Sequence, residues 1–491
     1  MSDGTPNAPS ARVPIFRRLL GESAVYGLGG VANQAVGIVL VPIYARQLGI
    51  EGYGTVALLT TTLSTATLIA TLAMPQAFFR AYLREASGDA ERRAVLATTL
   101  GLRLVASVAA LVLLLALAAP LAGLILGDAG DWVLMAVIGV VVLFDTLTIV
   151  PLSFLRAERR PLPYAVLGFG RALAGGVLIV GLVVVGDLGP LGVVLGSALA
   201  ALLAAAVAYL VLGRVGRLRI GFDRQLVRRM LAFGLPLVPA SLAGWALNMS
   251  DRYLVNAFDG REAVGVYAAG YTVGLALNAL AIAPFGLAWG AAYWEIARRD
   301  DAPRVISRVL TGFAGLASFM ALGLSALATD AFRLLLTPEF EPGRFVTPFS
   351  AFGLVGLGIF TILTTGINLA GRTRRLPLIM GAAALANIGL NLVLIPSFGY
   401  LGAAASSLLS YGLLAALGGF SSQRVYPVPW EVGRVALAVG IGMALTAASV
   451  LGPDHVAWRV ACIAAYPALV IGSGIVPRRY ASELIGLARR R

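Results

Sequence analysis

The sequence contains no lysine, one cysteine and one histidine among its 491 residues. Without lysine there is no GxxxxGK phosphate loop, which argues against a P-loop nucleotide motor. The single cysteine, Cys462, excludes a disulfide within the chain. The single histidine, His455, excludes zinc motifs built on histidine pairs and argues against a Ser–His–Asp site. We therefore expect no metal, no cofactor and no enzymatic activity.

Charged residues are also scarce. They make up 13% of the chain, about half the share of a soluble domain, whereas 59% of the residues are hydrophobic. The apolar residues fall in blocks of roughly 20, the length that crosses a hydrocarbon core of about 30 Å. Lipid offers no partner to an unpaired backbone group, so each block must be helical. The sequence predicts an all-α integral membrane protein.

We count fourteen such blocks and predict a membrane-spanning helix in each. Their approximate ranges are 24–47, 53–74, 95–120, 132–155, 164–186, 190–213, 231–257, 263–292, 307–328, 346–370, 376–396, 400–420, 432–451 and 457–476.

The net charge is +14, and every one of the 38 basic residues is an arginine. Such a balance is typical of nucleic-acid binding, but here the arginines lie in short loops between apolar blocks, which argues against that partner. With fourteen spans, thirty of the 38 arginines fall on the side of the two termini. Five fall on the opposite side (Arg46, Arg261, Arg333, Arg344, Arg459) and three within spans (Arg103, Arg171, Arg252). Positively charged loops stay inside, so we predict that both termini are cytoplasmic.

The chain also repeats itself at a nearly constant offset. Glu51, Gly54 and Ala57 recur 211 residues later as Glu262, Gly265 and Ala268, and Leu191-Gly192 recurs 210 residues later as Leu401-Gly402. Because six helices return the chain to the same side, both copies insert in one orientation. We expect a pseudo-twofold axis along the membrane normal and a rocking motion about a central cavity.

This repeat divides the chain into five parts. We predict a cytoplasmic tail over 1–20, an N-lobe of helices 1–6 over 21–215 and a C-lobe of helices 7–12 over 216–428. Two further helices occupy 429–476, and an arginine-rich cytoplasmic tail follows over 477–491.

Three stretches resemble the polysaccharide synthesis family of the multidrug/oligosaccharidyl-lipid/polysaccharide exporter superfamily. They are PIYARQLGIEGYGTVALL after helix 1, FGLPLVPASLAGWALNMSDRYLVNAFDGREAVGVYAAGY across helices 7 and 8, and GYLGAAASSLLSYGLLAAL at helix 12. The resemblance implies an O-antigen-type flippase in the bacterial plasma membrane. Such a protein carries undecaprenyl-pyrophosphate-linked oligosaccharide from the cytoplasmic to the outer leaflet, amid membrane lipids and alongside polysaccharide polymerase and export machinery.

Three alternatives stay open. Peptidoglycan lipid II flippases resemble this layout but carry arginine in the middle of helix 1, where this chain has Asn33 and Gln34. A drug or metabolite antiporter coupled to an ion gradient would need an essential carboxylate, for which Asp145 is the candidate. A membrane-bound polymerase or ligase would need a larger outer loop than any this sequence contains.

Five ionisable residues lie deep within predicted spans, away from the span ends, where each costs on the order of 2.5–3.5 kcal/mol and therefore faces a cavity or a partner. Arg103 and Arg171 could bind a pyrophosphate through their forked donors, with Asp145 holding them apart and titrating with a coupling proton. Asp251 and Arg252 could gate the outer end or bind sugar hydroxyls. The alternative for both groups is that they only pin helices together.

Two amides add a second layer of candidate substrate contacts. Asn387 and Asn391 are four residues apart in one predicted span, so they share a helix face and could bind sugar hydroxyls. The alternative is a structural hydrogen bond between helices.

Overall fold

The computed structural model describes residues 12–475, and every regular element in that range is helical. The first half of the chain forms α1 (Arg12–Thr71), α2 (Met74–Arg80), η1 (Ala81–Glu85), α3 (Asp89–Ala116), α4 (Ala118–Leu126), η2 (Ala129–Asp131), α5 (Trp132–Ala157), α6 (Pro161–Val180), η3 (Gly181–Val185) and α7 (Gly189–Arg214). The second half forms α8 (Arg224–Gly234), η4 (Leu235–Leu237), α9 (Val238–Leu277), η5 (Asn278–Ile282), α10 (Ala283–Ile296), α11 (Ala302–Leu335), η6 (Pro338–Phe345), α12 (Val346–Leu363), α13 (Thr365–Leu369), α14 (Arg375–Phe398), α15 (Tyr400–Gln423), α16 (Val432–Leu451) and α17 (Val456–Gly472).

The prediction of an all-α membrane protein is confirmed. Eleven helical stretches within 12–475 are long and apolar enough to cross a bilayer, and α17 is a shorter apolar helix. Two of the eleven, Val39–Glu85 and Arg224–Gly290, contain a glycine with non-helical backbone angles where the sequence predicts a boundary between two spans. The exact count of fourteen stays a prediction. Residues 12–20 belong to α1, whereas 1–11 and the predicted tail 477–491 lie outside the described residues.

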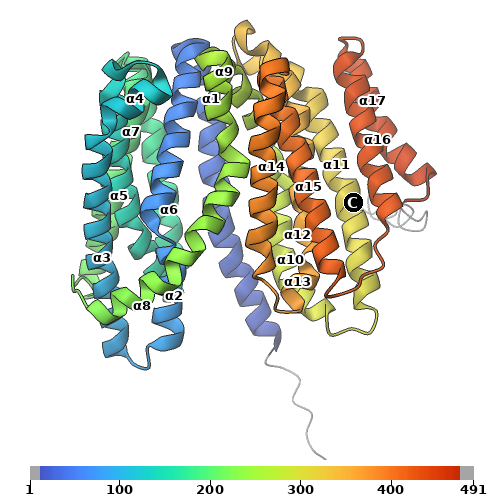
Figure 1. Cartoon of the computed structure of the whole chain (residues 1–491). Helices are drawn as coiled ribbons and strands as arrows, with labels where there is room; N and C mark the ends of the chain where they lie inside the picture. The colour runs from blue at the N-terminus through green and yellow to red at the C-terminus, as the bar shows by residue number, and fades with distance from the viewer. Residues whose placement is uncertain (1–11, 476–491) are drawn as a thin grey trace, which may run out of the picture.

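The helices stand side by side in two groups that meet along α1 and α9 (Figure 1). In the first group α5 packs on α3 and α7, and α6 packs on α7 and α1. In the second group α12 packs on α15, α11 and α9, and α14 packs on α15 and α9. The remaining pair, α16 and α17, lies against α11 at one side of the molecule. The predicted lobes 21–215 and 216–428, with their pseudo-twofold axis, stay a prediction.

Apolar side chains cover the outside of both groups. Val105 on α3 is 61% exposed, Val177 on α6 is 65% exposed and Leu385 on α14 is 73% exposed. In water such a belt would be costly, but a hydrocarbon core accepts it. The exposed belt and the buried core together require a bilayer around the helices.

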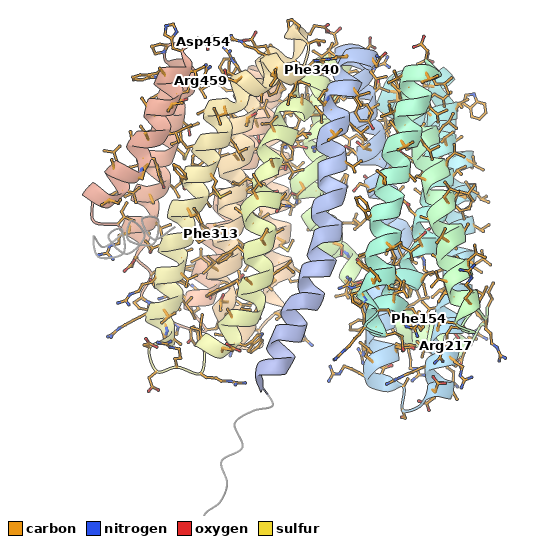
Figure 2. The ribbon with its side chains drawn as sticks, turned by 180° about the vertical axis from the view of Figure 1, so that it is seen from behind. Phe154, Arg217, Phe313, Phe340, Asp454 and Arg459 are labelled. Carbon is orange, nitrogen blue, oxygen red and sulfur yellow. The ribbon has the colours of Figure 1, made fainter. Side chains whose placement is uncertain are left out.

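The two ends of the molecule carry different charges. Figure 2 shows Arg217 at the end where most loop arginines lie, which we call the arginine-rich end, and Asp454 and Arg459 at the other, the arginine-poor end. Arg459 is almost fully buried and binds Asp330 of α11 at 2.7 Å and Asp454 at 2.6 Å. Hydrogen bonds from Arg333 and then from Arg459 lower the pKa of the Asp454 carboxyl. These ion pairs tie α17 to the second group of helices.

The two groups touch most closely at a pair of glycines near the arginine-poor end. A Cβ atom on Gly54 of α1 would overlap the carbonyl oxygen of Arg261, and one on Gly265 of α9 would overlap that of Ile50. The two contacts are equivalent under the sequence repeat. Gly265 stands 211 residues after Gly54, and Arg261 stands 211 residues after Ile50. The two backbone breaks obey the same offset, since Gly49 has φ 65° and Gly260 has φ 84°. The sequence repeat therefore corresponds to a local symmetry in the structure. Phe340 is buried in the apolar core next to this contact (Figure 2).

A buried arginine binds the C-terminal end of α1. The part of α1 that follows the backbone break at Gly49 is called its second segment. The helix stops at Thr71, and Leu72 and Ala73 both have left-handed backbone angles. The last carbonyls of a helix have no partner within it. Arg103 of α3, which has no exposed surface, donates from Nη1 to the carbonyl of Ala70 at 2.6 Å and from Nη2 to Ser107 at 3.4 Å. Arg103 thus caps this helix end, where its positive charge also suits the helix dipole.

We predict that Gly54→Ala and Gly265→Ala each destabilise the protein by about 1–3 kcal/mol, because neither facing backbone can move away from a new methyl group without opening the contact. The thermal midpoint of the purified protein, followed by size-exclusion chromatography, measures the loss. Gly312→Ala on α11 is the matched control, since a Cβ there meets nothing within 4 Å. Equal midpoints for all three variants would contradict the close contact.

We predict that Arg103→Ala also lowers the thermal midpoint, because it leaves the Ala70 carbonyl buried without a donor, a loss of about 1–3 kcal/mol. The substrate affinity of the folded fraction should not change. The comparison variant is Arg171→Ala. The Arg171 side chain that this variant removes is one third exposed. A normal midpoint with lost substrate binding in Arg103→Ala would overturn the capping role.

Candidate functional site

A polar cavity of about 510 Å³ lies between the two groups of helices. The second segment of α1 forms one wall, α5 and α6 contribute one charged residue each, and Val238 and Ser241 of α9 close it from the second group. The lining extends through Ala73, Pro75 and Gln76 toward the arginine-rich end, where Figure 1 places α2. The cavity is within the usual size range of ligand sites.

An ion pair supplies the only charges among the residues that line this cavity. Arg171 of α6 donates from Nε to one oxygen of Asp145 of α5 at 2.8 Å and from Nη2 to the other at 2.6 Å. The side chain of Arg171 is 33% exposed and that of Asp145 18% exposed, so both reach the cavity. This bidentate geometry is the strongest that an arginine and a carboxylate form. The pair leaves the lining of the cavity close to electrical neutrality.

Arg103 does not join this pair, although the sequence predicts an Arg103–Asp145–Arg171 cluster. Its donors are directed to Ala70 and Ser107, and it is not among the residues that line the cavity. The predicted grouping of Arg103 with Asp145 is therefore not observed, and contact of Arg103 with a substrate stays a prediction. The three residues do lie at comparable depth in their helices, but Arg103 points to the end of α1 and not to α5.

A line of hydroxyl groups on α1 faces the same cavity. Thr60, Ser64, Thr67 and Thr71 follow one another at intervals of four, three and four residues, which places them on one helix face. Thr60 donates to the carbonyl of Ala57 at 2.9 Å and Thr71 to that of Thr67 at 2.6 Å. Their protons are used on their own helix, so these oxygens remain free to accept hydrogen bonds. The hydroxyl of Thr67 is buried and has no partner within the described part of the chain.

A second cavity of about 260 Å³ continues between α1 and α9. Thr60 lines both cavities, so they are neighbours. Arg252 of α9 faces the second cavity together with the hydroxyl-bearing residues Tyr44, Tyr53 and Thr272. Two neighbouring cavities along α1 thus contain the Arg171–Asp145 pair and Arg252, respectively.

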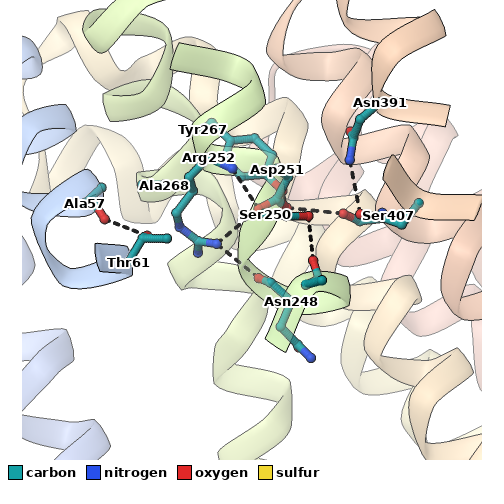
Figure 3. A network of polar contacts seen from close by, with 12 residues as sticks. Ala57, Thr61, Asn248, Ser250, Asp251, Arg252, Tyr267, Ala268, Asn391 and Ser407 are labelled. Carbon is teal, nitrogen blue, oxygen red and sulfur yellow. Dashed lines mark hydrogen bonds and ion pairs between the residues drawn. The ribbon is translucent and has the colours of Figure 1, made fainter. Parts of the chain in front are cut away.

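Asp251 and Arg252 are held in a buried network on α9, shown in Figure 3. Oδ1 of Asp251 accepts from Nη1 of Arg252 at 3.3 Å and from its backbone N–H at 2.9 Å. The other carboxylate oxygen accepts from the hydroxyl of Tyr267 and from that of Ser407 of α15 at 3.4 Å. The guanidinium of Arg252 also lies 4.8 Å from the centre of the Tyr271 ring, a cation–π contact. Asp251 is thus enclosed by protein, whereas Arg252 reaches a cavity.

Asn387 and Asn391 are fully buried on α14, and Nδ2 of Asn391 donates to Oδ1 of Asn387 at 3.1 Å. Neither residue lines the two cavities described above. This bond joins two residues of one helix, so neither a structural bond between helices nor contact of these amides with a substrate is shown, and both stay predictions. Among the residues described, no group of three or more His, Cys, Asp or Glu side chains is placed to hold a metal ion.

Sequence reasoning missed the hydroxyl line on α1 and the partners of Asp251. The α1 line had a readable signal, because four Ser or Thr residues at helical spacing within one apolar span are unusual. Tyr267 and Ser407 had none, since they lie 16 and 156 positions from Asp251 and only packing brings them together. The side chains of Asn33 and Gln34 lie outside those described.

The chain shares its fold with membrane transporters of known structure. A structure titled as the lipid II flippase MurJ, in an inward closed conformation, superposes with a TM-score of 0.72 at 15% identity, over 93% of this chain and 99% of that one. An inward-facing multidrug resistance MATE transporter of the MOP superfamily gives 0.60 at 15% identity, over 82% and 95%. A MOP superfamily transporter from Pyrococcus furiosus gives 0.59 at 14% identity, over 85% and 96%. At these identities the likeness establishes the fold alone.

Comparison of the sequence with curated proteins finds no significant match. A family model described as polysaccharide biosynthesis protein, however, matches residues 19–289, more than half of the chain. That range includes the α1 hydroxyl line, the Arg171–Asp145 pair and the Asp251–Arg252 pair. This chain of membrane-spanning helices therefore belongs to the polysaccharide biosynthesis protein family.

Proposed function

We propose that the protein is a flippase for an undecaprenyl-pyrophosphate-linked oligosaccharide. It would carry this lipid from the cytoplasmic to the outer leaflet of a bacterial plasma membrane, with both of its own termini in the cytoplasm. The observation that supports this most is the Arg171–Asp145 pair, a guanidinium accessible from a polar cavity at membrane depth. Membership of a polysaccharide biosynthesis family supports the glycan part of the substrate.

The charge chemistry of the pair suits a diphosphate. A pyrophosphate offers only acceptor oxygens, and Arg171 offers a planar fork of donors that Asp145 occupies in the empty cavity. When the substrate enters, its phosphate oxygens replace the carboxylate on the fork. Asp145 is then a carboxylate without its partner in a low-dielectric site, so it takes up a proton or a cation from the coupling gradient.

The hydroxyl line on α1 suits the glycan. Sugar hydroxyls donate hydrogen bonds, and the oxygens of Thr60 and Thr71 are left as acceptors by their bonds to the helix backbone. Phosphate, which has no proton to donate at neutral pH in its fully ionised form, gains nothing from such acceptors. The cavity therefore separates a phosphate contact at Arg171 from sugar contacts on α1.

The contacts between the two groups of helices fit alternating access. Near the arginine-poor end, Asn256 of α9 donates to the carbonyl of Ile125 of α4 at 2.8 Å, and Arg261 binds Glu51 at 3.3 Å. The cavity reaches the other way, toward the arginine-rich end. With arginine-rich loops in the cytoplasm, this arrangement corresponds to a state loaded from the cytoplasmic leaflet. Transfer to polymerase and export machinery would follow on the outer side.

The function is tested by depleting the protein and labelling lipid-linked glycans separately in each leaflet. We expect undecaprenyl-pyrophosphate glycan to accumulate on the cytoplasmic side, because its head cannot cross the hydrocarbon core unaided. An unchanged glycan distribution with altered drug tolerance would favour an ion-coupled antiporter and refute the proposal. Accumulation of lipid II alone, with arrest of wall growth, would instead favour a lipid II flippase.

Arg171→Ala should reduce transport by at least about tenfold while the protein still inserts, because the loss of one charge-assisted bidentate contact is worth about 1.5–3 kcal/mol. Glycan movement in proteoliposomes, normalised to inserted protein, is the measurement. Arg171→Lys keeps the charge but not the fork, so we expect only partial rescue.

Asp145→Asn is the informative companion variant. It frees the Arg171 fork, so we expect tighter substrate binding together with slower turnover. Wild-type transport by Arg171→Ala, or weaker binding by Asp145→Asn, would remove the pyrophosphate role.

A further inference from the structure

The segment that joins the two groups of helices has an unusual surface. It runs from Arg214 at the end of α7, through residues 215–223, to the end of α8 at Gly234. It contains six arginines and one acidic residue, Asp223. The Asp223 carboxylate is used as the cap of α8, accepting from the N–H groups of Gln225 at 2.8 Å and Leu226 at 3.1 Å. We call residues 214–234 the linker.

The first part of the linker, which has no regular secondary structure, is held against α3. Arg217 binds Asp89 at 2.8 Å, and the N–H of Gly221 donates to the carbonyl of Ala97 at 3.1 Å. The N–H of Asp223 donates to the Thr98 hydroxyl at 3.3 Å. The Gly221 carbonyl lies so close to Gly101 that a Cβ on Gly101 would overlap it. The first part of the linker is therefore attached to the helix bundle through α3.

This attachment leaves three large apolar side chains uncovered. Leu218 is 42% exposed, Ile220 63% and Phe222 64%. They occupy every second position of the segment between α7 and α8. Other exposed apolar side chains are explained by the hydrocarbon belt around the spans, but these three lie beyond the end of α7, among charged residues.

Arginines surround this apolar patch. Arg219, Arg224 and Arg228 are exposed, and none of them has an ion-pair or hydrogen-bond partner among the side chains and backbone groups that the structure describes. The rest of α8 is amphipathic, since Leu226 and Met230 are buried against the bundle while its arginines face outward. Exposed cations beside uncovered apolar side chains match a surface that has anionic groups above an apolar layer.

From this we infer that the linker binds the acidic phospholipids of the leaflet at the arginine-rich end, with Leu218, Ile220 and Phe222 inserted at the headgroup–acyl boundary. The position of the linker along the direction of the membrane-spanning helices supports a lipid partner. The linker follows the last turn of one span and precedes the next, and Figure 1 shows α8 lying across the bundle beside α2, near the arginine-rich end, with the turn between α2 and α3 extending beyond it. A charged segment at that level meets phosphate headgroups before it meets any soluble partner.

The test places a fluorescent reporter in the patch. Cys462 is the only native cysteine, so Cys462→Ala gives a background for labelling Ile220→Cys with an environment-sensitive dye. The protein is placed in nanodiscs whose quenching lipid, brominated near the headgroup, is either phosphatidylglycerol or phosphatidylcholine at one mole fraction. We expect quenching by the acidic lipid to be about twofold stronger, and the difference to disappear in high salt.

Two controls make the outcome specific. Val105→Cys on the lipid-facing side of α3 should be quenched equally by both lipids. In the Ile220→Cys background, R219Q/R224Q/R228Q should abolish the preference and R219K/R224K/R228K should keep it, since charge and not shape carries the attraction. Equal quenching of the Ile220 reporter by the two lipids would overturn the inference. So would no quenching, which would place the patch in water or under another protein.

Discussion

A hydrocarbon core gives charged and polar groups nothing to bind, and this constraint organises the whole molecule. Every charge at membrane depth described above has a protein partner: Arg103 has a helix-end carbonyl, Arg171 has Asp145, and Arg252 has Asp251. The partners differ in what they allow. A carbonyl at a helix end cannot leave, whereas a carboxylate beside a cavity can be exchanged for another anion. The accessible pair is thus the one with the chemistry of a binding site.

The same constraint explains how the two groups of helices meet. Near the arginine-poor end they approach through Gly54 and Gly265, which let two backbones touch without any side chain between them. Close backbone approach replaces the hydrophobic driving force that lipid removes. Away from this contact the helices separate, and polar side chains of α1 line the space that results. A tight point of contact beside an open cavity suits two bodies that tilt against each other.

The polar residues divide by burial into two kinds. Asp251, Asn387 and Asn391 are buried, and the hydrogen bonds described for them above are made within the second group of helices. Asp145, Arg171 and the α1 hydroxyls are accessible, and they belong to the first group and to its boundary with the second. On this division the proposed substrate contacts lie mainly on the first group of helices and on its boundary with the second.

The sequence by itself determined the membrane class, the position of most spans, the family and the 211-residue repeat, because these depend on composition and on spacing along one chain. It also identified Asp145 and Arg171 as costly residues that need a reason to be in a membrane. Only the tertiary structure decided which arginine faces the cavity. Depth along a helix can be counted from residue numbers, but the rotation of a helix about its axis is set by its neighbours. That rotation directs Arg103 to the end of α1, brings Arg171 to Asp145, and places Ser407 beside Asp251 across 156 positions of sequence.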